Sequence, residues 1–137
     1  YFVAPTVVDN LPEDHYLWKQ EMFLPIVTVT DYEDFDAALA EANAVDYGLT
    51  AGLYSQDPAE INQFLDTIEA GVIYVNRFSG ATTGAWPGFQ PFGGWKGSST
   101  TGKGSGGEHY LQQYMREQAQ TVVKLPGQTL PGEGWGE

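Results

Sequence analysis

The sequence predicts an α/β fold, because strand-like apolar runs alternate with helix-like patterns over its first 75 residues. Residues 25–30, 49–54 and 72–75 are rich in β-branched or aromatic side chains, which are typical of strands. Between them, residues 32–45 and 58–70 carry apolar side chains at helical spacing. This order and spacing predict two successive βαβ units with parallel strands.

The second of these helices has the clearest boundaries. Asp57 is the expected N-cap, Pro58 stands at the first helical position, and Glu60 lies three residues after the cap, as in a capping box. Gly71 is expected to end the helix. The predicted apolar face consists of four residues at helical spacing: Ile61, Phe64, Leu65 and Ile68.

The first helix is predicted to begin after Asp31 as its N-cap, with an apolar face formed by Phe35, Ala38, Leu39 and Ala42. Before it, a strand-like start is interrupted by Pro5, which indicates an edge or irregular strand. Residues 9–20 are expected to form a loop or a short helical turn. The continuous apolar run at 72–75 is typical of a parallel strand that is buried on both faces.

The character of the sequence changes after Asn76. Residues 79–107 hold many of the 17 glycines and follow neither a helical nor an alternating period. A loop of this length inside a compact domain is unusual unless it is functional. A short helix is expected at 108–115 and a strand at 118–124.

Composition limits the classes of function. Hydrophobic residues make up 42% of the chain, enough for a core, and no apolar stretch approaches the roughly 18–20 residues that span a bilayer. With no signal segment at the start, a soluble cytoplasmic protein is expected. The chain has no cysteine, which excludes disulfides and a cysteine nucleophile within it, and its two histidines have no metal-ligand spacing, so no metal site is predicted.

The net charge of −12 disfavours binding to nucleic acid or to an anionic membrane surface. Residues 1–69 carry 14 acidic side chains and one basic one, whereas residues 70–124 carry two acidic and five basic ones. The second half is therefore the part that could receive an anion. The alternative for each base taken alone is that it simply faces solvent.

The first candidate binding motif is Q-E-M-F-L-P at 20–25, directly before a predicted strand. A carboxylate at the edge of an α/β sheet is well placed to accept hydrogen bonds from ribose hydroxyls. The alternative is a surface Glu21 beside a core Phe23.

The second motif is P-F-G-G-W-K at 91–96. Paired glycines let the backbone approach another group closely, and Phe92 and Trp95 could supply an aromatic wall. The alternative is a tight turn with core aromatic residues.

The third motif is G-K-G-S-G-G at 102–107, in which exposed backbone N–H groups could form an anion-binding nest. It is not a P-loop, because Lys103 is followed by Gly104 instead of Ser or Thr. The alternative is a flexible linker.

Taken in order, these motifs resemble the aldehyde dehydrogenase superfamily over residues 1 to about 124. The resemblance rests on five segments: F-V-A-P-T-V at 2–7, Q-E-M-F-L-P at 20–25, Y-G-L-T-A-G-L-Y at 47–54, G-V-I-Y-V-N-R at 71–77 and P-F-G-G-W-K at 91–96. Asn76-Arg77, then Thr83-Gly84, then residues 103–110 are similar to the branch that oxidises L-glutamate γ-semialdehyde (1-pyrroline-5-carboxylate) in proline degradation. The cofactor implied is NAD or NADP.

The resemblance implies roles for particular residues. Glu21 is expected to bind the nicotinamide ribose and Phe23 to pack near the nicotinamide ring, although the family usually has Gly where this chain has Leu24. Two backbone N–H groups are expected to hold the substrate carboxylate. Alignment from Phe92 gives Ser105 and Gly106, and alignment from Tyr110 gives Gly106 and Gly107, which we prefer. Further substrate-binding residues implied are Phe92, Trp95 and Tyr114.

The resemblance also implies that the catalytic cysteine, the base glutamate, the oxyanion asparagine and the main dinucleotide-binding domain lie upstream. No catalytic residue is therefore expected here, and the chain alone is expected to be inactive. Residues 1–117 would form the C-terminal part of the catalytic domain, 118–124 the last strand of the oligomerisation sheet, and 125–137 a Pro- and Gly-rich tail.

The expected partners are a small aldehyde that carries a carboxylate and, in the full-length protein, further copies in a homo-oligomer. Because the chain begins with Tyr1, we expect it to be cut from a longer protein; the alternative is a processed small domain. Two other functional interpretations stay open. One is an aldehyde dehydrogenase for another aldehyde, and the other is a small acidic α/β binding module without enzymatic activity.

Overall fold

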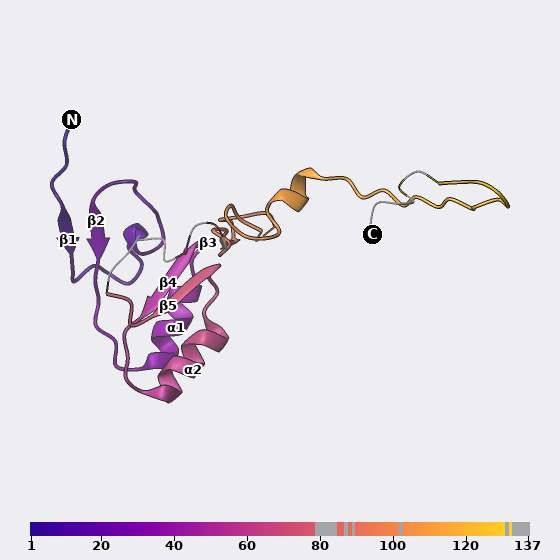
Figure 1. The fold of residues 1–137 in the computed structure, drawn as a ribbon. Helices are drawn as coiled ribbons and strands as arrows, with labels where there is room; N and C mark the ends of the chain where they lie inside the picture. Colours follow the sequence, from indigo (N-terminus) through magenta and orange to yellow (C-terminus); the bar gives the residue numbers. More distant parts are fainter. Residues whose placement is uncertain (79–84, 87, 89, 102, 131, 133–137) are drawn as a thin grey trace.

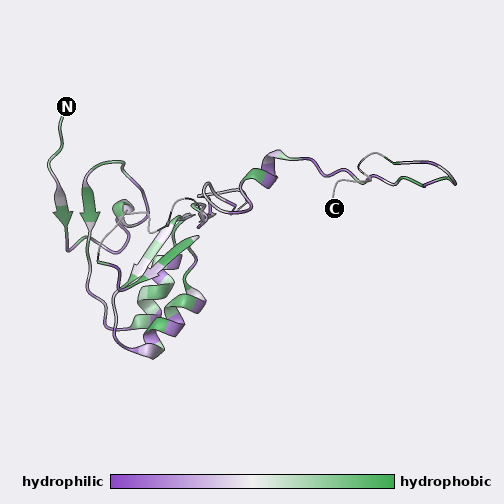
Figure 2. Ribbon diagram, viewed as in Figure 1, coloured by the Kyte–Doolittle hydropathy of each residue, from purple (hydrophilic) through white to green (hydrophobic). Residues whose placement is uncertain are grey.

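The computed structural model describes residues 1–78, 85, 86, 88, 90–101, 103–130 and 132. Helices α1 (Phe35–Asn43) and α2 (Pro58–Thr67) lie beside the parallel strands β4 (Thr50–Leu53) and β5 (Val72–Val75), and we call this unit the α/β body (Figure 1). Its core is a cluster of three buried side chains with four partly buried ones around it: Leu39, Phe64 and Ile68, then Phe35, Ala51, Leu53 and Val75. Figure 2 shows both helices as amphipathic beside the apolar strand β5.

Helix α2 begins as predicted. Asp57 is the N-cap and its Oδ1 accepts a hydrogen bond of 2.7 Å from the backbone N–H of Ala59, with Pro58 following the cap. Glu60 does not complete a capping box. Its carboxylate instead accepts a hydrogen bond of 2.5 Å from the hydroxyl of Ser55, which in turn accepts one from the N–H of Asp57.

The other end of α2 and part of its face differ from the prediction. The helix ends at Thr67, before Gly71, because the side chain of Asn43 binds the end of the helix. Phe64 and Ile68 are buried, but Leu65 is 45% exposed. A helical repeat identifies the apolar stripe, yet no element within the described residues covers the edge of the stripe where Leu65 lies.

Helix α1 is capped by Asp34, not by Asp31. Oδ1 of Asp34 accepts a hydrogen bond of 3.0 Å from the N–H of Ala37. Asp34 immediately precedes Phe35, whose side chain packs against the core, so the packing selects the later of two suitable caps. Of the remaining predicted face, Leu39 is buried, whereas Ala42 is exposed.

The described strands form three separate two-stranded sheets. β4 and β5 pair in parallel across α2, which confirms one βαβ unit. β2 (Ile26–Thr28) pairs with β1 (Thr6–Val8) and not with β4, so the second predicted unit is wrong. The apolar runs identified the strands but carried no information about which edge each strand joins. The strand at 72–75 is not buried on both faces as predicted, because Ile73 on one face of β5 is exposed.

The third sheet joins distant parts of the chain. β3 (Tyr47–Gly48) pairs antiparallel with β6 (Trp95–Lys96), which attaches the 91–96 motif to the α/β body. Before β2, the 3-10 turn η1 (Tyr16–Trp18) confirms the helical turn expected within 9–20. No helix in the part of the chain that the structure describes is long and apolar enough to cross a membrane.

The C-terminal segment runs away from the α/β body as exposed chain (Figure 1). The helix expected at 108–115 is the shorter 3-10 helix η2 (Leu111–Tyr114). Residues 118–124 are not a strand in this structure, and among the described residues no other strand lies beside this segment to pair with it. A β-ladder requires a neighbouring strand, so local strand propensity alone leaves this segment unpaired.

Candidate functional site

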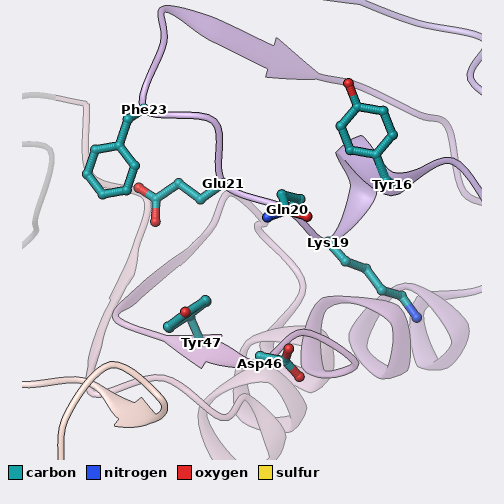
Figure 3. A pocket seen from close by; sticks show the side chains of 7 residues that line it. All are labelled: Tyr16, Lys19, Gln20, Glu21, Phe23, Asp46 and Tyr47. Atoms are coloured by element: carbon teal, nitrogen blue, oxygen red, sulfur yellow. The ribbon is translucent and has the colours of Figure 1, made fainter.

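An open cleft of about 440 Å³ lies between the segment that follows η1 and the start of β3, and we call it the Glu21 cleft (Figure 3). Seven residues line it: Tyr16, Lys19, Gln20, Glu21, Phe23, Asp46 and Tyr47. The turn that carries this segment is held locally. His15 Nδ1 accepts a hydrogen bond of 3.2 Å from the N–H of Leu17, and Trp18 Nε1 donates one of 2.9 Å to the carbonyl of Pro12.

Glu21 and Phe23 face the same cleft, as the first motif requires (Figure 3). Phe23 is 90% exposed, so the alternative of a core phenylalanine is wrong. Its backbone is left-handed, with φ of +50°, which is uncommon for a residue other than glycine. The sharp turn before β2 is therefore made by Phe23 itself, with Leu24 following it.

Chemically, this pair can hold a sugar next to a flat ring. A carboxylate accepts hydrogen bonds from two neighbouring hydroxyls, and an exposed aromatic ring offers a face for stacking. Sequence reasoning missed the opposite wall of the cleft. Asp46 and Tyr47 come from β3 and the residue before it, and the only sequence signal was the motif that begins at Tyr47.

The resemblance to aldehyde dehydrogenases implies hydride transfer to a nicotinamide, and we expect Glu21→Gln in the full-length protein to slow that step about 10- to 100-fold. A hydrogen bond to a charged group contributes roughly 1.5–3 kcal/mol, and the amide keeps the shape but loses the charge. Single-turnover absorbance of the reduced nicotinamide measures this rate. Asp66→Asn, which makes the same change from carboxylate to amide at an exposed position on α2 outside the cleft, serves as the control. An unchanged rate in Glu21→Gln would exclude this residue from cofactor binding.

Residues 91–96, which we call the aromatic turn, pack tightly against the α/β body. Gly93 and Gly94 are buried, and a Cβ on Gly71 would overlap the carbonyl oxygen of Gly93. The backbone N–H of Gly48 donates a hydrogen bond of 3.0 Å to Ser98 Oγ just beyond the turn. The tight turn is thus confirmed, but its aromatic residues are not core residues. Trp95 is 52% exposed and Phe92 is half-buried.

Residues 103–107, which we call the glycine loop, lie against the aromatic turn. Phe92 donates a backbone hydrogen bond of 2.9 Å to the carbonyl of Ser105, in an isolated antiparallel bridge. A Cβ on Gly104 would overlap the carbonyl of Phe92, so glycine is required by the close approach. The interpretation as a flexible linker is therefore wrong.

The next two residues of the loop present backbone donors. Gly106 and Gly107 are half-buried, and Gly106 has a left-handed φ of +86°. Within the described part of the chain, no acceptor takes the N–H of either residue. The carbonyl of Gly107 accepts a hydrogen bond of 3.1 Å from the N–H of Tyr110, which fixes the direction of the loop. This arrangement can hold an anion.

Tyr114 stands on η2, beside the glycine loop. Its hydroxyl donates a hydrogen bond of 3.2 Å to that of Tyr110, and the two rings meet edge to face at 5.4 Å. This hydrogen bond raises the pKa of Tyr114 above its usual value. Gln113 ties η2 to the loop by donating to the carbonyl of Lys103. In the described residues, no ring contact joins Tyr114 to Trp95.

The chain is similar in sequence to known proteins. Residues 1–120 match the aldehyde dehydrogenase family. It is 42% identical over 118 residues to the 2,5-dioxopentanoate dehydrogenase of Saccharolobus solfataricus, covering 85% of this chain and 24% of that protein. It is 41% identical over 125 residues to the 1-pyrroline-5-carboxylate dehydrogenase of Bacillus cytotoxicus, covering 91% of this chain and 23% of that protein.

A solved structure of 1-pyrroline-5-carboxylate dehydrogenase from Thermus with bound NAD superposes with a TM-score of 0.73 at 38% identity, covering 82% of this chain and 21% of that one. The chain therefore spans less than a quarter of the length of these relatives. The family match extends over most of the chain, and both the identities and the superposition agree with it. The chain belongs to the aldehyde dehydrogenase family.

Proposed function

We propose that this chain is part of an NAD(P)-dependent enzyme that oxidises an aldehyde bearing a carboxylate, namely L-glutamate γ-semialdehyde (1-pyrroline-5-carboxylate), to glutamate. The observation that carries the proposal is the pair of backbone N–H groups at Gly106 and Gly107, which no described acceptor engages. The two curated relatives support it, because the names of both their substrates include a carboxylate.

The residues around the loop suit such a substrate. Backbone N–H groups form charge-assisted hydrogen bonds with a carboxylate, and the absence of a Cβ on both glycines allows a close approach. The half-exposed ring of Trp95 offers an apolar wall for the aliphatic part of the substrate. Tyr114, whose hydroxyl donates a hydrogen bond to that of Tyr110, and the half-buried Phe92 complete the proposed set, while Ser105 contributes its backbone carbonyl to the bridge.

The Glu21 cleft suits the cofactor. Glu21 would accept hydrogen bonds from the ribose hydroxyls, and the exposed ring of Phe23 would pack beside the nicotinamide. Bound there, NAD would supply the hydride acceptor for the oxidation. This chain has no cysteine and so supplies no thiolate for attack on the aldehyde, which leaves the isolated chain without activity.

The test is substrate preference in the full-length enzyme. We expect kcat/KM for glutamate semialdehyde to exceed that for pentanal by about 100-fold or more, since two hydrogen bonds to a charge each contribute roughly 1.5–3 kcal/mol. Equal values for the two aldehydes would contradict the proposal.

The 42% identity to a 2,5-dioxopentanoate dehydrogenase favours that aldehyde as a second candidate. Both candidates carry a carboxylate, so both would use the glycine loop. They differ next to the carboxylate, where one has an amino group and the other an oxo group. A direct comparison of kcat/KM for the two aldehydes distinguishes them, and either result is compatible with an anion site at Gly106 and Gly107.

We also propose that residues 118–124 pair with another copy of the protein. The segment is exposed, including the apolar side chains of Val122 and Val123 and of Leu125 just after it. Extended chain with unpaired backbone groups and exposed apolar side chains tends to pair with another chain. Deleting residues 118–137 from the full-length protein is expected to give smaller assemblies by light scattering. Deleting only residues 126–137 is the control. The same mass in both would assign the segment another role.

A further inference from the structure

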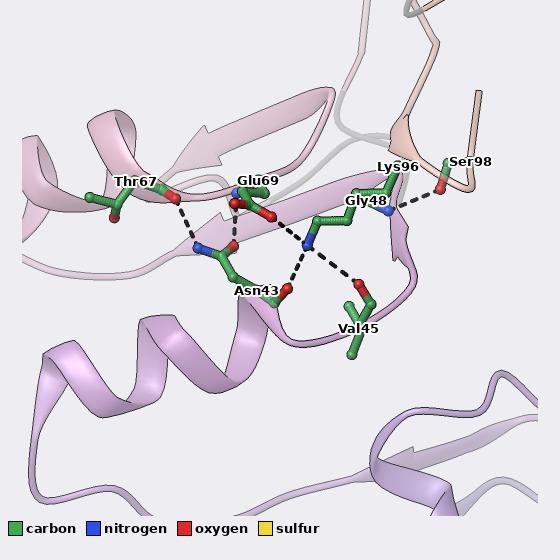
Figure 4. A network of polar contacts seen from close by, with 7 residues as sticks. All are labelled: Asn43, Val45, Gly48, Thr67, Glu69, Lys96 and Ser98. Carbon is green, nitrogen blue, oxygen red and sulfur yellow. Dashed lines mark hydrogen bonds and ion pairs between the residues drawn. The ribbon is translucent and has the colours of Figure 1, made fainter. Parts of the chain in front are cut away.

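Lys96, the last residue of the aromatic turn, reaches back to the ends of both helices of the α/β body (Figure 4). Its ammonium lies 2.8 Å from the carboxylate of Glu69 and donates a hydrogen bond of 2.6 Å to the carbonyl of Asn43. A longer bond of 3.4 Å reaches the carbonyl of Val45. The side chain is only 22% exposed, so these contacts are partly shielded from water.

These contacts complete the end of α1 directly and reach the end of α2 through the side chains of Glu69 and Asn43. Neither α1 nor α2 has a basic residue in its last turn, where unpaired carbonyls carry partial negative charge. Asn43, the last residue of α1, also donates a hydrogen bond of 2.8 Å to the carbonyl of Thr67 and accepts one of 2.8 Å from the N–H of Glu69. The ammonium therefore ties the aromatic turn to the end of α1 and to Glu69, which follows α2.

The backbone of Lys96 indicates that its side chain is needed there. Its φ is +52°, in the left-handed region that favours glycine. A lysine in this conformation costs free energy that its side-chain contacts must offset. The aromatic turn therefore keeps its position through the side chain of Lys96 as well as through the β3–β6 pairing.

A shift at Lys96 would reach the proposed substrate residues directly. Trp95 is its neighbour on β6, and Phe92, four residues before, is bridged to Ser105 of the glycine loop. Gly104 leaves no space between the loop and Phe92. The aromatic turn and the glycine loop should thus move together when their attachment to the α/β body is loosened.

We propose that Lys96 is a positioning residue for the substrate: its contacts with Glu69 and with the end of α1 hold the aromatic turn and the glycine loop where a carboxylate-bearing aldehyde is bound. The inference rests on the proposed function and extends it to the residues that set the affinity for this substrate class. Lys96 itself touches no substrate in this mechanism, because its ammonium is engaged with the α/β body.

The experiment measures KM and kcat in the full-length enzyme for glutamate semialdehyde and for pentanal. Lys96→Gly removes the side chain and also relieves the left-handed backbone, so strain cannot explain its effect. We expect KM for glutamate semialdehyde to rise about 10-fold, with kcat within about 2-fold, and KM for pentanal to rise clearly less, since pentanal uses the apolar wall but not the anion site. Lys96→Arg keeps the cation and should recover part of the loss. Glu69→Gln, which keeps the size of the partner, should show a smaller rise of the same kind.

Any one of the following outcomes would overturn the proposal. In Lys96→Gly, KM for both aldehydes could stay at the wild-type value. Alternatively, this variant could lose activity equally with both aldehydes and have a lower Tm, which would make Lys96 purely structural. If Lys96→Gly fails to fold, an unchanged KM ratio in Glu69→Gln overturns it. A wild-type enzyme without preference for glutamate semialdehyde overturns the proposed function, and this inference with it. A wild-type preference that all variants retain overturns the role of Lys96 alone.

Discussion

Replacing Gly107 with valine is expected to lower kcat/KM for glutamate semialdehyde by about 100-fold or more, because two charge-assisted hydrogen bonds of roughly 1.5–3 kcal/mol each depend on access to this loop. A Cβ at position 107 would lie 3.0 Å from Cβ and 3.1 Å from Cα of Pro91. The added methyl groups must therefore either displace the aromatic turn or occupy the space of the anion. Pentanal, which lacks a carboxylate, should lose far less. Steady-state kinetics with both aldehydes measures the difference.

Two smaller substitutions test whether the loss comes from a blocked anion site or from a general disturbance of the loop. Gly107→Ala adds only the Cβ, at a residue whose φ is not positive, whereas Gly106→Ala places a side chain on a left-handed backbone at φ of +86°. If the loop binds the carboxylate, both should reduce the preference for glutamate semialdehyde over pentanal. An equal loss for both aldehydes in all three variants would make the loop structural and leave the substrate class open.

Gly71→Ala is expected to destabilise the protein by about 3 kcal/mol or more, at the upper end for overpacking. The new Cβ would overlap the carbonyl oxygen of Gly93 and lie 2.9 Å from Cα of Gly94. Both neighbours are backbone atoms of a buried turn, so they cannot move aside as a side-chain tip can. Thermal unfolding of the full-length protein and its soluble yield report the loss.

Gly52→Ala is the matched control for this substitution. Its Cβ would overlap the ring of Tyr74, which is a side chain and can rotate away. We therefore expect a clearly smaller decrease in Tm than in Gly71→Ala. Similar Tm values for the two variants would mean that the aromatic turn does not press on Gly71 in the folded protein.

Features that depend on neighbouring residues could be predicted from the sequence. The cap of α2 at Asp57 is an example, because the acceptor and donor lie two residues apart. Strand pairing depends on the whole chain, and nothing local distinguished β1 from β4 as the partner of β2. The choice between Asp31 and Asp34 also needed the core, because both residues are good caps and only the packing of Phe35 separates them.

In the candidate site, too, features set by neighbouring residues could be predicted and features set by distant residues could not. The positions of Glu21, Phe23 and the glycine loop followed from motifs that are continuous in the sequence. The partners of Lys96 did not, because Asn43 lies 53 residues away and binds through a backbone carbonyl that any residue would offer. Residues 118–124 show the remaining limit. Their strand propensity is local, but the strand that would complete a ladder is not among the described residues.

The junction at Lys96 also bears on how new substrate specificities could be built from relatives of this protein. A chimaeric enzyme that receives the aromatic turn and glycine loop of another family member would keep its own Asn43 and Glu69 while acquiring a foreign partner for them. Gly71 adds a further requirement. The backbone of the foreign turn must pack closely against Gly71, as the backbone of Gly93 and Gly94 does in this protein. Crossover points placed before residue 43 would transfer all of these partners together. Crossovers between 71 and 91 would separate them, so we expect fewer folded chimaeras from that interval.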